Sequence, residues 1–257
     1  MSKKEAKNRY NLIDILRGIA VICMIIYHTM WDIVYMMGVD IPFFHTSGAH
    51  IFQQYILWSF VIISGFCVAL GKKTLRRGAI VFGISVAMGL FTIFFMPEAA
   101  IYFGVLTFLG SAMIITELLK KPLSKLPYYI GIPLSAIIFF ITFNISDHSL
   151  GFGKLILYNL PDRLYINHLT AFLGFPHNGF NSADYVPLLP WIFLYWFGFY
   201  AYKLFKDNDL LKYLSVKRLP FAEWLGKHAL EIYVAHQPLI CGILFLINYL
   251  NNQKFIG

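Results

Sequence analysis

The sequence predicts an all-α protein, a polytopic transmembrane helical bundle of about seven spanning helices plus a re-entrant or interfacial segment. The first observation is composition, because 58% of the 257 residues are hydrophobic and 13% are charged, whereas soluble domains contain about 25% charged residues. The second is that the apolar residues fall in long blocks, with Lys and Arg gathered between them. Such a chain has too few charges to cover a surface that faces water, so we expect it to lie in a lipid bilayer.

Each predicted span contains close to the roughly 20 mostly apolar residues that a helix needs to cross the hydrocarbon core. Glycine and proline mark most of the joints between spans. The predicted spans are about 12–36, 51–70, 79–96, 101–119, 127–145, 186–205 and 229–249. The sequence contains no internal repeat and no low-complexity tract, so we expect residues 1–257 to form a single integral-membrane domain.

The net charge of +8 predicts orientation rather than binding of nucleic acid, because the basic residues alternate with the apolar spans. This pattern places the N-terminus in the cytoplasm and the C-terminus outside, in a plasma membrane. The basic residues of the loops predicted to be cytoplasmic are Lys3, Lys4, Lys7, Arg9, Lys72, Lys73, Arg76, Arg77, Lys120, Lys121, Lys125 and those from Lys203 to Lys227. The opposite loops hold Lys154, Arg163 and Lys254.

Residues 146–185 form the longest connection between predicted spans. Their apolar stretch LTAFLGF is too short to cross a membrane, so we expect a re-entrant or interfacial segment on the outer side. Long connections of this kind often serve as binding loops.

Ionisable residues form a stripe on the first span, LIDILRGIAVICMIIYHTMWD. At 3.6 residues per turn, Asp14, Arg17, His28 and Asp32 fall within roughly 60° of one face. Each charge at mid-membrane costs at least about 2.5–3.5 kcal/mol, so this face is expected to look into the bundle or into a polar passage. A plainer interpretation for Asp14 and Arg17 is an ion pair near the cytoplasmic interface.

The last span supplies polar partners in the sequence AHQPL. His236 and Gln237 lie near the middle of the membrane, just before Pro238, which frees a backbone carbonyl one turn earlier. His236 as a packing residue is the alternative.

The outer side holds three further candidates. His45 in FFHTSG precedes the second span, and Asp184 and Trp191 frame the outer entrance of the sixth span in SADYVPLLPW. The aromatic residues there also fit an interfacial belt. No histidine or cysteine spacing is typical of zinc sites, so we expect no metal.

Several stretches of the chain resemble, in order, the heparan-α-glucosaminide N-acetyltransferase catalytic-domain family, small membrane proteins that are common in bacteria. The stretches are RYNLIDILRGIAVICMIIYHTMWD, ISGFCVAL, TLRRG, IYFGVLTFLG, DYVPLLPWIFLYWFGFY and LGKHALEIYVAHQPL. The resemblance implies transfer of an acetyl group from cytoplasmic acetyl-CoA to an amino sugar on the far side of a bacterial inner membrane.

By position, His28 and Asp32 match the family's histidine and acidic residue on the first helix. The other matched polar positions are Asp14, Arg17, Asp184 and His236. The chain departs from the family at Thr107, where a histidine is frequent. Eukaryotic members have asparagine near the position of His28 and a histidine before the second span, where His45 or His50 stands here. The identity of the catalytic histidine therefore stays open.

Acetyl transfer needs a base that takes the proton of the acceptor. We expect His28 to be this base, with Asp32, four residues further on the same face, orienting it. His236 would polarise the thioester carbonyl or hold the acceptor. Arg76 and Arg77 could clamp the CoA phosphates, although membrane topology alone also explains them. A route through an acetyl-histidine is equally compatible.

Two alternatives to this function remain. A proton-coupled transporter or flippase would also carry a membrane-spanning Asp/Arg/His stripe, although the chain lacks the internal repeats of many such transporters. An O-acetyltransferase of a surface glycan would differ in the acceptor alone. A homo-oligomer is compatible with the sequence.

Overall fold

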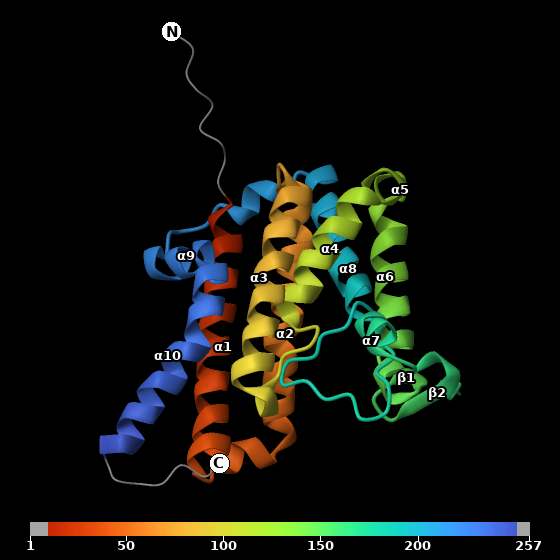
Figure 1. Cartoon of the computed structure of the whole chain (residues 1–257). Helices are drawn as coiled ribbons and strands as arrows, with labels where there is room; N and C mark the ends of the chain where they lie inside the picture. Colours follow the sequence, from red (N-terminus) through yellow and green to blue (C-terminus); the bar gives the residue numbers. More distant parts are fainter. Residues whose placement is uncertain (1–9, 251–257) are drawn as a thin grey trace. The chain divides into compact units, whose positions relative to one another are not determined.

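The computed structural model describes residues 10–250, and these form a mainly helical membrane protein (Figure 1). Its described part contains five helical segments that are long and apolar enough to cross a membrane. They are Asn11–Met37 (α1), Ser47–Leu70 (α2), Thr74–Phe95 (α3), Tyr128–Asp147 and Ala229–Leu250 (α10). The fourth of these consists of α6 (Tyr128–Thr142) and the 3-10 turn η3 (Ile145–Asp147).

The two other predicted spans are also helical, but they are shorter. They form α4 (Val105–Leu118), with 14 residues, and α8 (Trp191–Asp207), with 17 residues. The helical fold class is therefore confirmed, whereas the count of seven spans stays a prediction.

The chain divides into two compact units. Unit 1 consists of the described chain up to Phe60 and from Asp209 onward, and unit 2 is Val61–Asn208. Helix α2 contributes its first half to unit 1 and its second half to unit 2. The prediction of a single domain stays a prediction.

In unit 1, α1 packs against α9 (Pro220–Lys227) and α10. Glycines allow the close approach of α1 and α9, because a Cβ atom on Gly18 would collide with the backbone of Ala222, and one on Gly226 with the backbone of Asp14. Two 3-10 turns, η1 (Pro42–His45) and η5 (Leu210–Leu214), complete the unit.

In unit 2, the main helix pairs are α3 with α4 and α6 with α8. Small residues again set the spacing: a Cβ atom on Gly110 would collide with Phe82, and one on Gly131 with the ring of Tyr200. A Lys-rich helix, α5 (Lys120–Lys125), follows α4, and the Lys203 ammonium donates to the carbonyls of Ser124 and Leu126 beside it. A 3-10 turn, η2 (Pro97–Ala99), follows α3.

The long connection 146–185 contains a β-hairpin that the helical prediction missed. Strands β1 (Ser149–Phe152) and β2 (Leu155–Asn159) pair antiparallel, with an irregularity between Leu150 and Gly151. The 3-10 turn η4 (Asp162–Leu164) and the short helix α7 (His168–Leu173) follow. Asn167 and Thr170 form a reciprocal capping box at the start of α7. A re-entrant or interfacial course of this segment stays a prediction.

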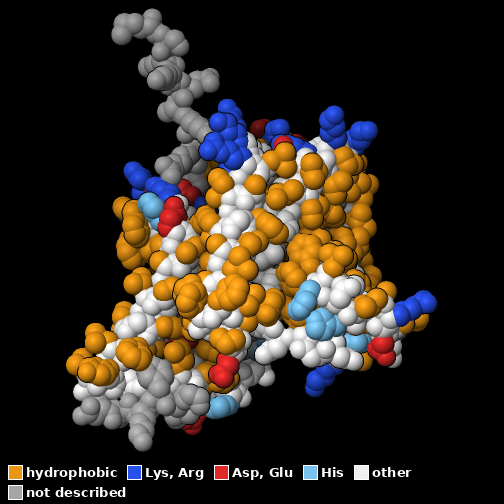
Figure 2. Space-filling view, viewed as in Figure 1, with side chains coloured by type: hydrophobic (Ala, Val, Ile, Leu, Met, Phe, Trp, Pro, Cys, Tyr) orange, Lys and Arg blue, Asp and Glu red, His pale blue; other side chains and the backbone are white. Residues whose placement is uncertain are grey.

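Within unit 2, the basic residues between α2 and α3 and those of α5 lie at the same end, whereas the hairpin with Lys154 in its turn lies at the opposite end (Figures 1 and 2). This separation fits the predicted alternation of loops. The basic positions Lys3, Lys4, Lys7, Arg9 and Lys254, on which the orientation of the two termini also depends, lie outside the described residues.

Candidate functional site

The candidate site lies in unit 1, where α1 and α10 bring together two predicted histidines. Nδ1 of His28 lies 2.9 Å from Nε2 of His236, and the ring centroids are 4.9 Å apart. His236 is 7% exposed. The predicted polar face of α1 therefore meets the predicted polar positions of α10.

A backbone contact fixes the proton positions in this pair. Nδ1 of His236 lies 2.6 Å from the carbonyl oxygen of Tyr233, one turn earlier in α10. A carbonyl oxygen only accepts, so Nδ1 of His236 carries the proton. With both rings neutral, Nε2 of His236 accepts from Nδ1–H of His28, and the free lone pair of His28 is then on its Nε2 atom.

Both ring nitrogens of His236 are engaged within the protein. The expected role of this ring, polarising the thioester or holding the acceptor, stays a prediction. Asp32 was expected to orient His28, but its carboxylate accepts from Gln237 instead. The physical reason is that α10 supplies two consecutive polar residues, which occupy both positions on the face of α1.

Asp32 lies fully buried beside Gln237. Nε2 of Gln237 is 2.9 Å from each carboxylate oxygen, and Sγ of Cys241 is 3.9 Å from Oδ2. These contacts join α1 to α10 one turn beyond the histidine pair. A buried carboxylate needs such donors, because burial without hydrogen bonds is costly.

Asp14 and Arg17 occupy the other end of the stripe and contact α9. Nη1 of Arg17 lies 3.5 Å from Oδ1 of Asp14 and 3.0 Å from the carbonyl oxygen of Gly226. Both side chains are partly buried. The two residues thus form the ion pair of the plainer interpretation, with Arg17 roughly 16 Å along the axis from His28.

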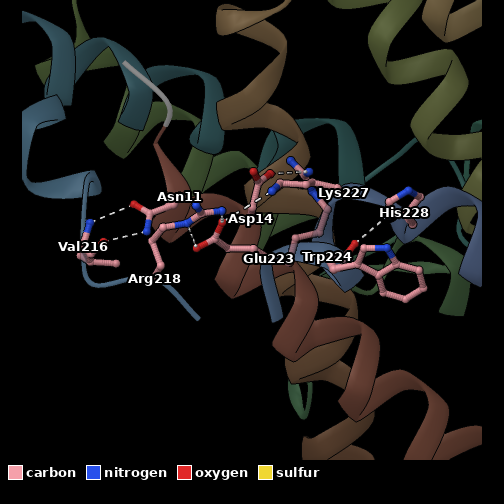
Figure 3. A network of polar contacts seen from close by, with 9 residues as sticks. Asn11, Asp14, Val216, Arg218, Glu223, Trp224, Lys227 and His228 are labelled. Carbon is pink, nitrogen blue, oxygen red and sulfur yellow. Dashed lines mark hydrogen bonds and ion pairs between the residues drawn. The ribbon is translucent and has the colours of Figure 1, made fainter. Parts of the chain in front are cut away.

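Sequence reasoning missed a polar network where α9 joins α1 (Figure 3). The Glu223 carboxylate is 1% exposed, and its oxygens lie 3.1 Å from Nη2 of Arg218 and 3.5 Å from Nζ of Lys227. Hydrogen bonding from Arg218 lowers the pKa of Glu223, against the opposing effect of burial, and contact with Glu223 raises the pKa of Arg218. The available sequence signal was the spacing of Glu223 from two basic residues, five residues after Arg218 and four before Lys227.

The network also holds the loop before α9 at the start of α1. Nδ2 of Asn11 donates to the Val216 carbonyl over 2.7 Å, and the Val216 amide donates to Oδ1 of Asn11 over 2.9 Å (Figure 3). This pair closes a connection of 205 residues along the chain.

The remaining candidates have other surroundings. His45 lies in η1 and is exposed, with its Nε2 atom 2.8 Å from Oδ1 of Asp40. In unit 2, Arg76 and Arg77 are exposed in the first turn of α3. Trp191 is buried at the start of α8, with its ring 5.6 Å from that of Phe139 on α6.

The Asp184 side chain caps the start of a neighbouring helix. Its Oδ2 atom accepts from the amide of Val105, the first residue of α4, over 2.9 Å. Ser182 supports this arrangement by bonding to both backbone groups of Tyr102. A helix start has unpaired amides, so Asp184 stabilises α4 from 79 residues away.

Among residues 10–250, no group of three or more His, Cys, Asp or Glu side chains is placed to hold a metal ion. The expectation that the protein uses no metal stays a prediction.

A comparison with known families finds a match over most of the chain. The family described as heparan-alpha-glucosaminide N-acetyltransferase, catalytic, matches residues 9–238. Searches of curated proteins and of solved structures found no match. The matched range includes the histidine pair, the Asp32–Gln237 contact and the α9 network.

Proposed function

Since the chain belongs to the heparan-α-glucosaminide N-acetyltransferase catalytic-domain family, whose members are membrane acetyltransferases, we propose that it moves an acetyl group from acetyl-CoA to an amino sugar or glycan across a bilayer. The observation that carries this proposal is the hydrogen bond between His28 and His236. This bond leaves the lone pair of His28 on its Nε2 atom, so His28 can act as a base within a membrane helix. The donor, the acceptor and the sidedness are parts of the proposal.

His28 is the proposed base. The acceptor's amine or hydroxyl attacks the thioester carbon, a C–N or C–O bond forms, and the C–S bond breaks. Nε2 of His28 takes the acceptor's proton, and that proton then passes to the CoA thiolate, so the ring returns to its neutral form. Positioned bases of this kind accelerate a reaction by about 10²–10⁴-fold.

His236 is a positioning residue in this proposal. Its Nδ1–H donates to the Tyr233 carbonyl, so its Nε2 atom accepts from Nδ1–H of His28. The lone pair of His28 is then on its Nε2 atom, on the side of the ring away from His236. The same hydrogen bond stabilises the imidazolium that forms when His28 takes a proton. Asp32 and Gln237 hold α1 and α10 together next to the pair.

Acetyl-CoA carries phosphates, and Arg76 and Arg77 are the residues proposed to bind them. Both are exposed in the first turn of α3, beside Lys72 and Lys73. Guanidinium groups bind phosphate oxygens in pairs, and a helix N-terminus favours anions. We assign this end to the cytoplasm, with the C-terminus on the opposite side of a bacterial plasma membrane.

Purified protein in sealed liposomes tests the function. Acetyl-CoA with an isotopic label in its acetyl group is placed outside the liposomes, and glucosamine is enclosed inside. An acetyltransferase then acetylates the enclosed amino sugar and releases one free CoA thiol per product. A transporter or flippase would instead accumulate an unmodified substrate without acetyl-CoA. Glucosamine blocked at its nitrogen separates N-acetylation from O-acetylation, because only an O-acetyltransferase still forms product.

Trapping separates direct transfer from a route through an acetyl-histidine. Labelled acetyl-CoA without acceptor is mixed with the protein, and the protein is analysed for retained label. Direct transfer leaves the chain unlabelled, whereas the two-step route leaves an acetyl group on a histidine.

A further inference from the structure

Helix α9 has two faces of opposite character. One face is buried and includes Glu223, Leu225 and Gly226. The other face presents Phe221 and Trp224, three residues apart and therefore neighbours on a helix, with exposed fractions of 70% and 52%. An eight-residue helix that exposes two large aromatic side chains has an apolar face that its own unit does not cover.

The contacts of α9 fix its depth relative to two spanning helices. Its buried face touches α1 at Asp14 and Gly18, roughly 5–10 Å along the axis from the start of α1. His228 alone separates its end from the start of α10. Helix α9 thus lies where two apolar helices begin, which is the depth of an interfacial amphipathic helix.

The charged residues around α9 determine the charge of this exposed face. Lys212, Lys217 and Arg218 are exposed, and Lys227 is partly exposed. The single acidic side chain of α9, Glu223, is buried and already paired with Arg218 and Lys227. Glu231, in the first turn of α10, is exposed as well. Three basic groups, Lys217, Arg218 and Lys227, thus face two acidic ones, and the net charge beside Phe221 and Trp224 is positive.

We propose that the α9 surface, formed by Lys217, Arg218, Phe221, Trp224 and Lys227, is a docking site for anionic phospholipid. The two aromatic side chains enter the boundary between headgroups and acyl chains, and the basic groups contact lipid phosphates. Asn11 holds the loop that carries Lys217 and Arg218 at the start of α1, so the basic groups lie at headgroup level. Through α9, this lipid contact stabilises the end of α1 that carries Asp14 and Arg17.

Fluorescence quenching in nanodiscs tests the site on the full chain. Discs of phosphatidylcholine contain the same fraction of either brominated phosphatidylglycerol or brominated phosphatidylcholine. The Trp224 signal is the difference between the wild type and Trp224→Phe, which must have equal melting temperatures. We expect both brominated lipids to quench this signal, and the anionic lipid to quench it more strongly.

Lys217, which lies on the α9 surface but outside the Glu223 network, supplies the charge test. Lys217→Gln should lower the preference of the Trp224 environment for phosphatidylglycerol by roughly fivefold. Lys154→Gln, in the turn of the hairpin, is the matched control and should leave the preference unchanged.

Four results overturn the proposal. The first is a Trp224 signal that neither brominated lipid quenches, and the second is equal quenching by the two lipids. The third is quenching that decreases as more copies of the chain share one disc, because a second copy of the chain then covers the α9 surface in place of lipid. The fourth is protection of Trp224 by CoA in neutral discs that depends on Lys217, which assigns it to CoA.

Discussion

Nδ1 of His28 and Nε2 of His236 lie 2.9 Å apart, although 208 residues separate them along the chain. This contact links the first and last spanning helices and determines which nitrogen of His28 can act as a base. It also gives His236 a role that acts through His28. Each of these roles leads to a distinct measurable effect.

Replacement of His236 separates a positioning role from direct contact with substrate. His236→Ala removes the acceptor of a hydrogen bond that strengthens when His28 becomes an imidazolium, from about 0.5–1.5 to about 1.5–3 kcal/mol. The loss of this difference, about 1–1.5 kcal/mol, should lower kcat by roughly 5- to 13-fold. His236→Gln retains an acceptor for Nδ1–H of His28 and should restore part of kcat. The KM values for acetyl-CoA and for the acceptor should change little in both variants, and a large rise in either would indicate that His236 binds substrate.

Replacement of Gln237 tests the junction between α1 and α10. Gln237→Leu leaves the buried Asp32 carboxylate without its amide donor, which should cost about 1–3 kcal/mol of unfolding free energy. Thermal or denaturant unfolding in detergent measures this loss. Gln53→Leu, on an exposed position of α2, is the control and should have little effect. Equal stability of the two variants would contradict the importance of the Asp32 contact.

The Glu223 network predicts a loss of stability in acid. Hydrogen bonding from Arg218 holds the pKa of Glu223 below its ordinary value of 4.5. A lowered folded-state pKa stabilises the protein above the unfolded value, and this stability disappears as pH falls through the folded value. The melting temperature of the wild type should therefore drop below pH 4.5, and Glu223→Gln should lack this part of the drop. Parallel curves for the two proteins would contradict the role of the ion pairs.

Two glycine substitutions test the contact of α9 with α1. Gly226→Ala places a methyl group on the backbone of Asp14, so we expect a loss of about 1–3 kcal/mol. Gly242→Ala in α10 is the matched control, because no described atom lies within 4 Å of its added methyl group. The control should be neutral or more stable by up to about 1 kcal/mol. Equal stabilities would show that α9 does not pack closely on α1.

Periodicity predicted much of the candidate site. It placed His28 and Asp32 on one face of the first span, and the apolar blocks placed His236 and Gln237 at a matching depth. It could not predict which partners bond, because residues on one helix face compete for the groups of another helix. Two consecutive polar residues of α10 thus took the contacts that the spacing of His28 and Asp32 suggested for each other.

Other features were hidden because they depend on distant contacts. The carboxylate of Asp184 has the chemistry of a binding group, but it bonds to the start of α4, 79 residues earlier. The stretch LILYN has no alternation of polar and apolar residues, so nothing marked it as a strand until it paired with Ser149–Phe152. Glu223 lies in a run of basic residues that predicted membrane orientation, so the sequence did not mark it as buried. Its burial arises only when α9 packs on α1.

The most direct measurement is acetyl transfer by His28→Ala in liposomes, with acetyl-CoA on one side and glucosamine on the other. His45→Ala is the parallel variant, because His45 is an exposed histidine paired with Asp40. If His28 is the base, its replacement should slow transfer by about 10²–10⁴-fold at an unchanged melting temperature, while His45→Ala stays within twofold of wild type (roughly the scatter of such assays). Transfer at nearly the wild-type rate by folded His28→Ala would contradict the assignment of the reaction to this histidine pair.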